Sequence, residues 1–274
     1  MSAFHIFSIS AFLLTLPIHA SEPPQNLRTG NLVAWCIVPF DASKRSPEQR
    51  AAMLAGLGLK HSAYDWRAEH VPTFEREILA YRKHDITFTA FWDTHPDAIA
   101  LFKKHNLSPQ LWKTAPSPDA PDQPTKIKLA ADALAPIAVQ AASIGSKLGL
   151  YNHGGWGGEP GNLVAVAQEL HRRGHHNVGI VYNLHHAHHR VKTFAADLKL
   201  LSPHLLCLNL NGTNTPPQPK ILPLGQGQHD SSLLKIILSS SYTGPVGILD
   251  HRSDTDTKTA LQQNLTGLKS LLSE

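Results

Sequence analysis

Eight short apolar segments alternate along the chain with segments of helical periodicity, and this alternation constrains the fold more than any other feature. The apolar segments are residues 32–40, 58–66, 86–92, 108–112, 148–153, 178–183, 205–211 and 246–250. Each is short and is followed by polar or glycine-containing sequence, as expected of buried strands. Apolar residues at i, i+3 and i+4 spacing predict helices at residues 48–57, 72–84, 96–105, 127–144, 161–173, 189–201, 231–239 and 256–272.

Strands that alternate with helices predict a parallel sheet with right-handed crossovers. Eight such units, in a chain of 274 residues, favour an α/β protein built as a single (β/α)8 TIM barrel, which typically needs about 250 residues. A doubly wound open sheet is the alternative. No G-x-G-x-x-G sequence follows the first predicted strand, so the dinucleotide-binding version of that fold has no support.

The first 20 residues differ from the rest of the chain. They contain no Asp, Glu, Lys or Arg, and their apolar stretch, residues 6–18, is shorter than the roughly 20 residues needed to span a bilayer. Small Ala20 is followed by polar sequence. We therefore predict a signal peptide at residues 1–20, a linker at 21–30 and the barrel at 31–274. The alternative is a buried N-terminal helix or an uncleaved anchor. The signal predicts a periplasmic or secreted protein with no stable membrane association after cleavage.

Charge and cysteine content limit the partners. Lys+Arg 25 and Asp+Glu 21 give a formal net charge of +4 without any block of like charges, which disfavours a nucleic acid partner. An exported protein can form disulfides. Cys36 and Cys207 each lie inside an apolar segment, so buried free thiols are favoured over a bridge between them.

The residues that follow each predicted strand indicate the active site, because a barrel of this type builds it at the carboxyl ends of its strands. Four tryptophans and several amides occur there, and amphipathic aromatic rings beside amides suit a carbohydrate. The predicted substrate-binding residues are Trp66, Glu69, Trp92, Trp112, Asn152, Trp156, Asn183, Asn209, Asn211 and Gln226. The alternative is that the tryptophans close the core and that Glu69 caps the next helix.

Histidines are unusually frequent, with 18 in the chain. His171, His175 and His176 precede the sixth strand and belong to the opposite end of the barrel. His185, His186 and His188 follow that strand and belong to the functional end. Imidazole titrates near neutrality and is a common metal ligand, so this second group suits either proton transfer or metal binding.

Several strand-end motifs resemble those of the xylose-isomerase-like TIM barrel superfamily, which includes sugar phosphate isomerase/epimerase-like proteins and endonuclease-IV-type enzymes. The matching segments are residues 150–155 (LYNHGG), 178–186, 208–212, 224–230 and 247–250. The resemblance implies a barrel that binds one divalent metal ion. Its ligands come from Glu on strand five, Asp on strand six, His on strand seven and Glu on strand eight, and the two glutamates move a proton next to a carbonyl.

Carried onto this sequence, those four positions fall on Tyr151, Asn183, Asn209 and Asp250. Only Asp250 keeps a carboxylate, so the usual metal ligands are largely replaced. Hard cations prefer charged oxygens. A divalent metal ion therefore remains an open question, with His186 and Asp250 as its candidate ligands.

Two functions follow from these observations. In the first, the protein is an exported sugar isomerase or epimerase, or a lyase, that acts on a sugar or keto-sugar by proton transfer. His153, His186 and Asp250 are then the catalytic acid/base groups, and we expect them to face one cavity. In the second, the protein is a non-catalytic carbohydrate-binding barrel that has lost the metal site.

Overall fold

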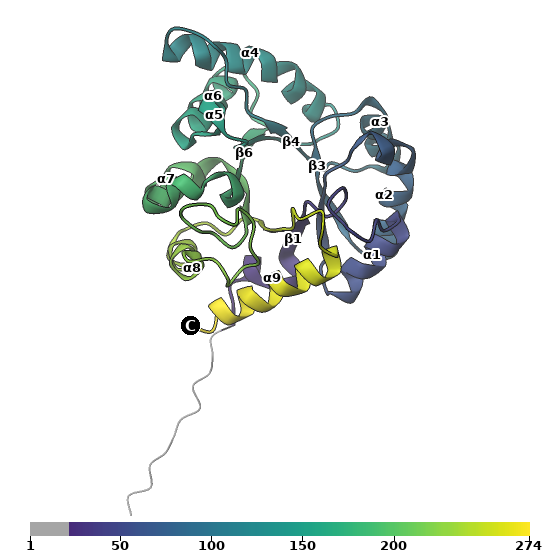
Figure 1. Cartoon of the computed structure of the whole chain (residues 1–274). Helices are drawn as coiled ribbons and strands as arrows, with labels where there is room; N and C mark the ends of the chain where they lie inside the picture. Colours follow the sequence, from purple (N-terminus) through teal and green to yellow (C-terminus); the bar gives the residue numbers. More distant parts are fainter. Residues whose placement is uncertain (1–21) are drawn as a thin grey trace, which may run out of the picture.

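A closed barrel of eight parallel strands, paired in sequence order, forms the centre of the molecule (Figure 1). The computed structural model describes residues 22–274. The strands are β1 (Leu32–Trp35), β2 (His61–Tyr64), β3 (Thr87–Trp92), β4 (Gln110–Thr114), β5 (Leu148–Tyr151), β6 (Val178–Asn183), β7 (Leu205–Leu210) and β8 (Val246–Leu249). Pairing of β1 with β8 closes the barrel. The predicted single (β/α)8 TIM barrel is confirmed.

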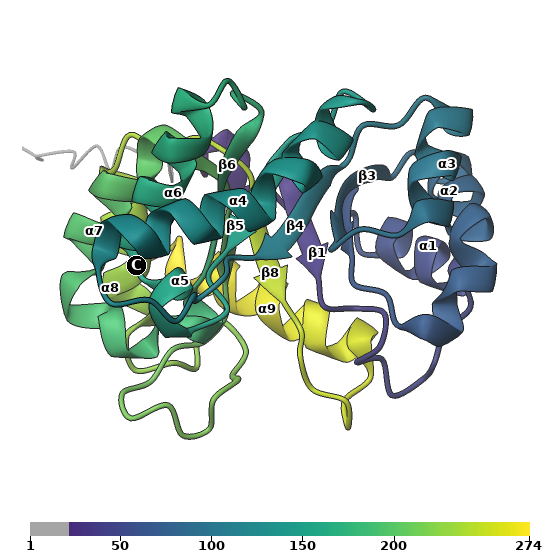
Figure 2. The same cartoon turned by 90° about the horizontal axis from the view of Figure 1, so that it is seen from above.

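Helices surround the barrel on its outer face (Figures 1 and 2). They are α1 (Pro47–Gly56), α2 (Phe74–Lys83), α3 (Pro96–His105), α4 (Gln123–Ala142), α5 (Gly155–Gly158), α6 (Pro160–Arg172), α7 (Phe194–Leu201), α8 (Asp230–Ser239) and α9 (Thr257–Leu271). All eight predicted helices are present. The helix predicted at 189–201 is α-helical only from Phe194, because its first turns, His188–Thr193, are 3-10 helix. The single-turn helix α5, in the glycine-rich segment after β5, was not predicted.

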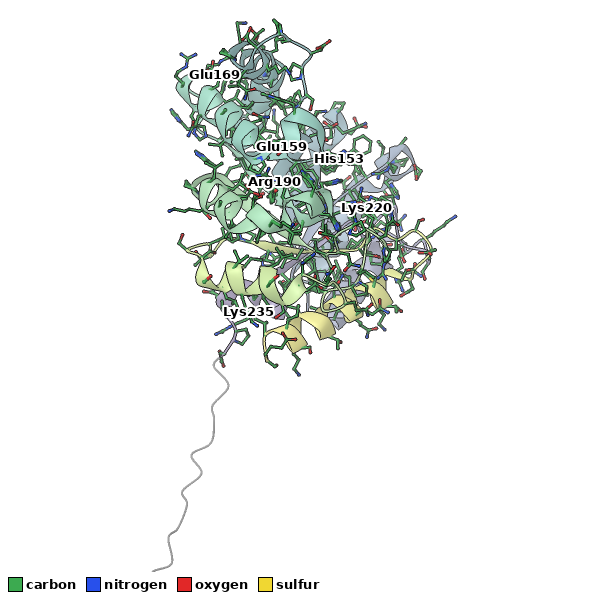
Figure 3. All side chains as sticks on the ribbon, turned by 60° about the vertical axis from the view of Figure 1, so that its left-hand side comes forward. His153, Glu159, Glu169, Arg190, Lys220 and Lys235 are labelled. Carbon is green, nitrogen blue, oxygen red and sulfur yellow. The ribbon has the colours of Figure 1, made fainter. Side chains whose placement is uncertain are left out.

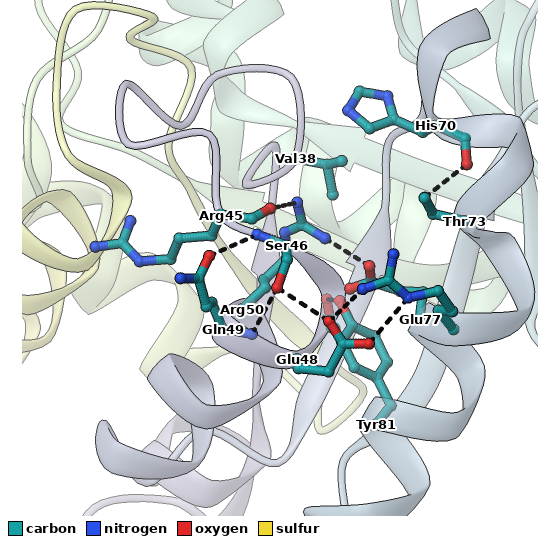
Figure 4. Close-up of polar contacts among 12 residues, drawn as sticks. Val38, Arg45, Ser46, Glu48, Gln49, Arg50, His70, Thr73, Glu77 and Tyr81 are labelled. Atoms are coloured by element: carbon teal, nitrogen blue, oxygen red, sulfur yellow. Dashed lines mark hydrogen bonds and ion pairs between the residues drawn. The ribbon is translucent and has the colours of Figure 1, made fainter.

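Sequence signals explain where helices begin and how they pack together. Ser46 forms a capping box with Gln49 ahead of Pro47, so α1 begins at a proline whose missing N–H costs nothing. Buried Arg50 of α1 then forms an ion pair of 2.5 Å with Glu77 of α2 (Figure 4). This pair joins the first two helices beside the end of β2.

Two apolar layers fill the structure. The larger lies between the strands and the helices, and a smaller one fills the barrel interior, where it includes Trp35, Trp112 and Tyr151. The interior has room for these rings because a neighbouring position lacks a side chain. A Cβ at Gly149 would lie 2.9 Å from the Trp112 indole. These aromatic rings therefore fill the barrel interior beneath the carboxyl ends of the strands.

The remaining expectations about organisation have mixed outcomes. Cys36 and Cys207 are free and buried, as predicted. The predicted signal peptide at residues 1–20 lies outside the described residues. From Glu22 onward the predicted linker contains two 3-10 turns, Gln25–Leu27 and Thr29–Asn31. Within residues 22–274, no helix is both long and apolar enough to cross a membrane.

Candidate functional site

A cavity of about 200 Å³ opens at the carboxyl ends of the strands. Its lining combines aromatic, imidazole and acidic side chains: Trp35, Cys36, Phe40, Asp65, Arg67, Trp92, Tyr151, His153, Asn183, His185, His186, Leu249 and His251. Larger hollows, such as one of about 570 Å³ beside α7 and α8, lie away from these strand ends and are lined by few titratable groups. The strand-end cavity is therefore the candidate site.

Four histidines form a row of neighbouring rings along this cavity. The ring centroids of His153 and His186 are 4.4 Å apart, those of His186 and His185 are 4.5 Å apart, and those of His185 and His251 are 5.1 Å apart. They come from the segments after β5, β6 and β8. At the far end of the row, His251 lies against the ring of Phe40, with centroids 3.8 Å apart.

The environment keeps the inner imidazoles neutral. Burial, with the nearby His153 and Lys220, lowers the pKa of His186 to about 3. Burial, with His186 and Lys220, lowers the pKa of His185 to about 2. Figure 3 labels Lys220 and His153. A neutral imidazole can both donate and accept a hydrogen bond, so each inner ring can polarise a bound carbonyl without carrying charge.

Asp65 is a functional candidate that the sequence analysis missed. It directly follows β2, is 2% exposed and lines the cavity. Its Oδ1 accepts the Val38 amide N–H at 3.3 Å, whereas its Oδ2 has no partner within the described chain. Burial raises the pKa of Asp65 to about 7. Its position directly after a strand is visible in the sequence, which predicts Glu69 as the acidic site residue of this segment.

Tyr151 and Asn183, at two of the expected metal-ligand positions, form a hydrogen-bonded network instead. The Trp35 indole N–H donates to the Tyr151 oxygen at 3.0 Å, and the Asn183 amide also donates to it. Asn152 holds the Asn183 backbone in place, accepting from its N–H at 2.7 Å and donating to its carbonyl at 3.0 Å. Neutral groups thus fix the floor of the cavity.

The backbone beside the cavity is strained at one position. Cys36, the residue after β1, has a φ of 57°, a left-handed conformation that costs a non-glycine residue roughly 1–3 kcal/mol. Its thiol faces the same cavity as Asp65, and burial raises its pKa well above the ordinary value. The thiol therefore remains protonated, and it lines the cavity without acting as a nucleophile.

The structure brings together some of the predicted site residues. His153, His186, Trp92 and Asn183 all line the cavity. Asp250 does not, although Leu249 and His251 on either side of it do. Its carboxylate accepts the Thr257 hydroxyl of α9 at 3.2 Å and pairs with Arg252 at 3.4 Å. The expectation of one cavity shared by His153, His186 and Asp250 is thus met by the two histidines alone.

Three of the predicted tryptophans serve packing instead of lining the cavity. The Trp66 indole donates to the Trp92 carbonyl and packs on Phe74 in the outer layer. The Trp112 indole is fully buried in the barrel interior below the cavity. The Trp156 indole donates to Gln123 at the start of α4. For these positions the alternative interpretation, tryptophan as a structural residue, describes the geometry.

The remaining predicted binding residues also lie outside the lining. Glu69 is exposed in the 3-10 helix Ala68–Thr73 after β2, and Gln226 is exposed before α8. Asn152 is buried below the cavity, where it holds the β6 backbone. Asn209 is buried inside the barrel, and Asn211 is buried after β7, where it donates to the Gly212 carbonyl.

A comparison with protein families matches residues 97–271 to the family described as xylose isomerase-like TIM barrel. The chain belongs to this family. No match was found among curated protein sequences.

Solved structures of the same architecture resemble this member of the xylose isomerase-like family. A probable 3-DHS dehydratase from Bacillus anthracis has a TM-score of 0.69 at 11% identity, covering 87% of this chain and 98% of that one. A D-psicose 3-epimerase from Clostridium cellulolyticum H10 has a TM-score of 0.62 at 11% identity, covering 88% and 97%. A 3-keto-D-glucoside 4-epimerase from E. coli has a TM-score of 0.59 at 13% identity, covering 88% and 98%. These similarities show the fold.

The residues of this xylose isomerase-like barrel do not fit the divalent metal ion that the family resemblance implies. Of Tyr151, Asn183, Asn209 and Asp250, only Asp250 is a carboxylate, and Thr257 and Arg252 already engage it. Because Asp250 also lies outside the cavity lining, it does not form a metal site together with His186. Across residues 22–274, no group of three or more His, Cys, Asp or Glu side chains is arranged to hold a metal ion.

Proposed function

We propose that the protein is a sugar isomerase or epimerase that moves a proton on a small sugar or keto-sugar bound in the strand-end cavity. The observation that carries the proposal is Asp65, a buried carboxyl with an unpartnered oxygen, in the same cavity as His153 and His186. The volume of about 200 Å³ favours a ligand smaller than those of drug-sized pockets, which span roughly 300–1,000 Å³.

The roles follow from the environments of these groups. Because the pKa of Asp65 is about 7, its carboxyl can both release and take up a proton near neutral pH, as a general acid/base requires. One such group removes the proton from the carbon next to the carbonyl, and the electron pair moves onto the carbonyl oxygen. Returning a proton to the other face of the same carbon restores the carbonyl and gives the epimer. Returning it to the former carbonyl carbon gives the isomer, because the proton of the adjacent hydroxyl also moves to the former carbonyl oxygen. His153, exposed at the cavity mouth, is the second proton-transfer group.

His186 has a different role in the proposal. Its neutral imidazole donates a hydrogen bond to the carbonyl oxygen, where negative charge develops. The low pKa of His186 prevents the ring from becoming an imidazolium at neutral pH. The aromatic rings of Trp35 and Trp92 supply an apolar wall for the sugar.

The second candidate function is a carbohydrate-binding barrel without catalysis. The specific observation that favours it is the replacement of three of the four family ligand positions by Tyr151, Asn183 and Asn209. In that case the same cavity holds the sugar, and no carbon-bound proton exchanges with solvent.

Hydrogen exchange separates the two functions. The purified protein is incubated in D2O with D-fructose, D-psicose, D-glucose, D-xylose and a 3-keto-glucoside, and NMR follows deuterium incorporation next to the carbonyl. Exchange in at least one sugar, absent with Asp65→Asn, supports the isomerase. A thermal shift with a sugar, but no exchange in any, supports the binding protein and rejects the isomerase.

We also propose that the protein is exported, on the sequence of residues 1–20 alone. The test is N-terminal sequencing of protein recovered from the periplasm or the medium. A chain that begins at Ser21 supports cleavage after Ala20. Retention of Met1 in protein found inside the cell contradicts export.

A further inference from the structure

The hydroxyl of Tyr151 has both of its acceptor positions occupied, and this determines what its own hydrogen can do. An indole N–H can only donate, so the contact of 3.0 Å from Trp35 places one donor on the Tyr151 oxygen. Asn183 contributes a second contact to the same oxygen. Whether Asn183 donates or accepts there depends on the orientation of its amide.

The backbone fixes that orientation. The amide N–H of His185 donates to Asn183 Oδ1 at 3.0 Å, and a backbone N–H cannot accept. The oxygen of the Asn183 amide therefore faces His185, and its NH2 group faces Tyr151. Asn152 locks this arrangement, since it binds both the N–H and the carbonyl of Asn183. The Tyr151 oxygen thus receives two donors.

A phenol oxygen with two lone pairs in use keeps one capability, which is to donate its own hydrogen. Tyr151 is 2% exposed and lines the cavity. Within residues 22–274, no acceptor of this hydrogen is found. Burial raises the pKa of Tyr151 well above the ordinary value, so the hydrogen stays on the oxygen.

We infer that the Tyr151 hydroxyl is a dedicated hydrogen-bond donor to the substrate oxygen on which negative charge develops. It stands at a position where the family resemblance implies a metal ligand. Because Trp35 and Asn183 occupy both lone pairs of its oxygen, the hydroxyl can bind an oxyanion through its own hydrogen, without a cation. The ring centroid of Tyr151 is 5.8 Å from that of His186, so the two residues can address the same substrate oxygen.

The ligand class that follows is a small carbonyl compound whose carbonyl oxygen becomes an enolate oxygen. An alcohol at the same position gains less from the donor, because its oxygen develops no charge. The substrate class rests on the proposed function. The availability of the Tyr151 hydroxyl as a donor does not, because it follows from the hydrogen bonds that Trp35 and Asn183 make to it.

The kinetic test compares Tyr151→Phe with Tyr182→Phe. Tyr182 is a matched control because its hydroxyl is also buried, and that hydroxyl has no hydrogen-bond partner within the described chain and belongs to the outer apolar layer instead of the cavity. For Tyr151→Phe we expect kcat to fall about 100-fold or more with KM changed less than about threefold, as for the loss of one oxyanion donor. Tyr182→Phe retains wild-type kcat. A fall in kcat shared by both variants, or a change confined to KM, overturns the inference.

A second measurement covers the case in which Tyr151→Phe folds poorly or the wild type shows no turnover. The wild-type protein, with 5 tyrosines in all, is labelled at tyrosine Cζ. The Tyr151 resonance is assigned by its loss in Tyr151→Phe or, failing that, in Tyr151→Trp. D-fructose and its reduced counterpart D-mannitol are then titrated in the presence of EDTA.

The inference is supported when the Tyr151 resonance shifts more with D-fructose than with D-mannitol. This holds even when no deuterium exchange occurs, because the absence of exchange contradicts only the proposed function. Exchange of the sugar hydrogen without any response of Tyr151 defeats the inference and leaves the proposed function standing. Equal responses to both compounds, or none to either, overturn the donor role.

Discussion

The imidazole rings of His153 and His186 lie with their centroids 4.4 Å apart, although they follow different strands of the barrel. Neighbouring strands in a parallel sheet end at the same edge, and β5 pairs with β6 in register from Leu148 opposite Val178 to Tyr151 opposite Val181. The two segments that leave these strands therefore meet above the barrel. This contact places two titratable groups on one wall of the cavity.

Replacing His153 by glutamine tests its role as a proton-transfer group. Glutamine keeps the hydrogen-bonding capacity of the side chain and cannot titrate. We expect the rate of deuterium exchange to fall by about 10²–10⁴-fold, the usual contribution of a general acid/base, with an unchanged melting temperature. The control is His176→Gln. His176 is exposed before β6, at the opposite end of the barrel. Comparable losses in both variants would contradict the assignment.

Removal of metal ions should leave the protein unchanged. The donors at the expected ligand positions are a protonated phenol, two amides and one carboxylate that is already engaged by Thr257 and Arg252. Such a set holds a divalent cation poorly. Dialysis against EDTA is expected to alter neither the exchange rate nor the melting temperature, and elemental analysis is expected to give far less than one Zn, Mn or Mg per chain. Loss of exchange that added Mn or Mg restores would refute this prediction.

Asp250 is expected to contribute to stability more than to chemistry. Its fully buried carboxylate connects the end of β8 to α9 through Thr257, and it pairs with Arg252. Asp250→Ala leaves these groups without their partner, which costs roughly 1–3 kcal/mol of unfolding free energy. Urea denaturation measures this loss. The exchange rate per folded molecule should stay within tenfold of wild type. A large loss of rate at unchanged stability would restore Asp250 as a catalytic group.

Much of the fold could be predicted from the sequence because each strand and helix carries its own periodicity. The helix Pro96–His105 and the strand Val178–Asn183 were predicted with their observed bounds, and most of the other boundaries differ by a few residues. The one-turn helix Gly155–Gly158 could not be predicted, since its four residues carry no apolar repeat. Its backbone packs closely on the segment after β4, where a Cβ at Gly157 would clash with the Pro116 carbonyl oxygen.

The site was harder to predict than the fold, for a physical reason. Strand ends give the neighbourhood of a side chain but not its direction, and successive residues point to opposite sides. This is why Asp250 was placed in the cavity, whereas His251 lines it and Asp250 faces α9. The role of Asp65 depends on an unpartnered oxygen, which only the folded arrangement of Val38 and β2 reveals.

The raised pKa of Asp65 predicts that the free energy of unfolding depends on pH. Its pKa is about 7 in the folded protein against an ordinary value of 3.8, because burial disfavours the charged carboxylate. Between about pH 4 and pH 7 the folded state therefore holds a proton that the unfolded state has released. The stabilisation is complete below pH 4 and is lost as the pH rises through 7. Up to about 4 kcal/mol of unfolding free energy depends on this proton.

Asp65→Asn removes that dependence while it keeps an oxygen for the Val38 N–H. Asp250, whose pKa burial raises to about 6, contributes a slope of the same sign in both proteins. The difference between variant and wild type therefore isolates Asp65. We expect urea denaturation to show the variant gaining stability relative to wild type between pH 5 and pH 8, by about 1–4 kcal/mol. The control is Asp254→Asn, at an exposed loop position, for which we expect no such gain.

Because Asp65→Asn is also expected to lose exchange activity, a gain in its stability at pH 8 would show that the buried carboxyl of Asp65 is retained at a cost to folding. An unchanged difference between pH 5 and pH 8 would mean that Asp65 is ionised throughout this range, and it would remove Asp65 as the proton-transfer group.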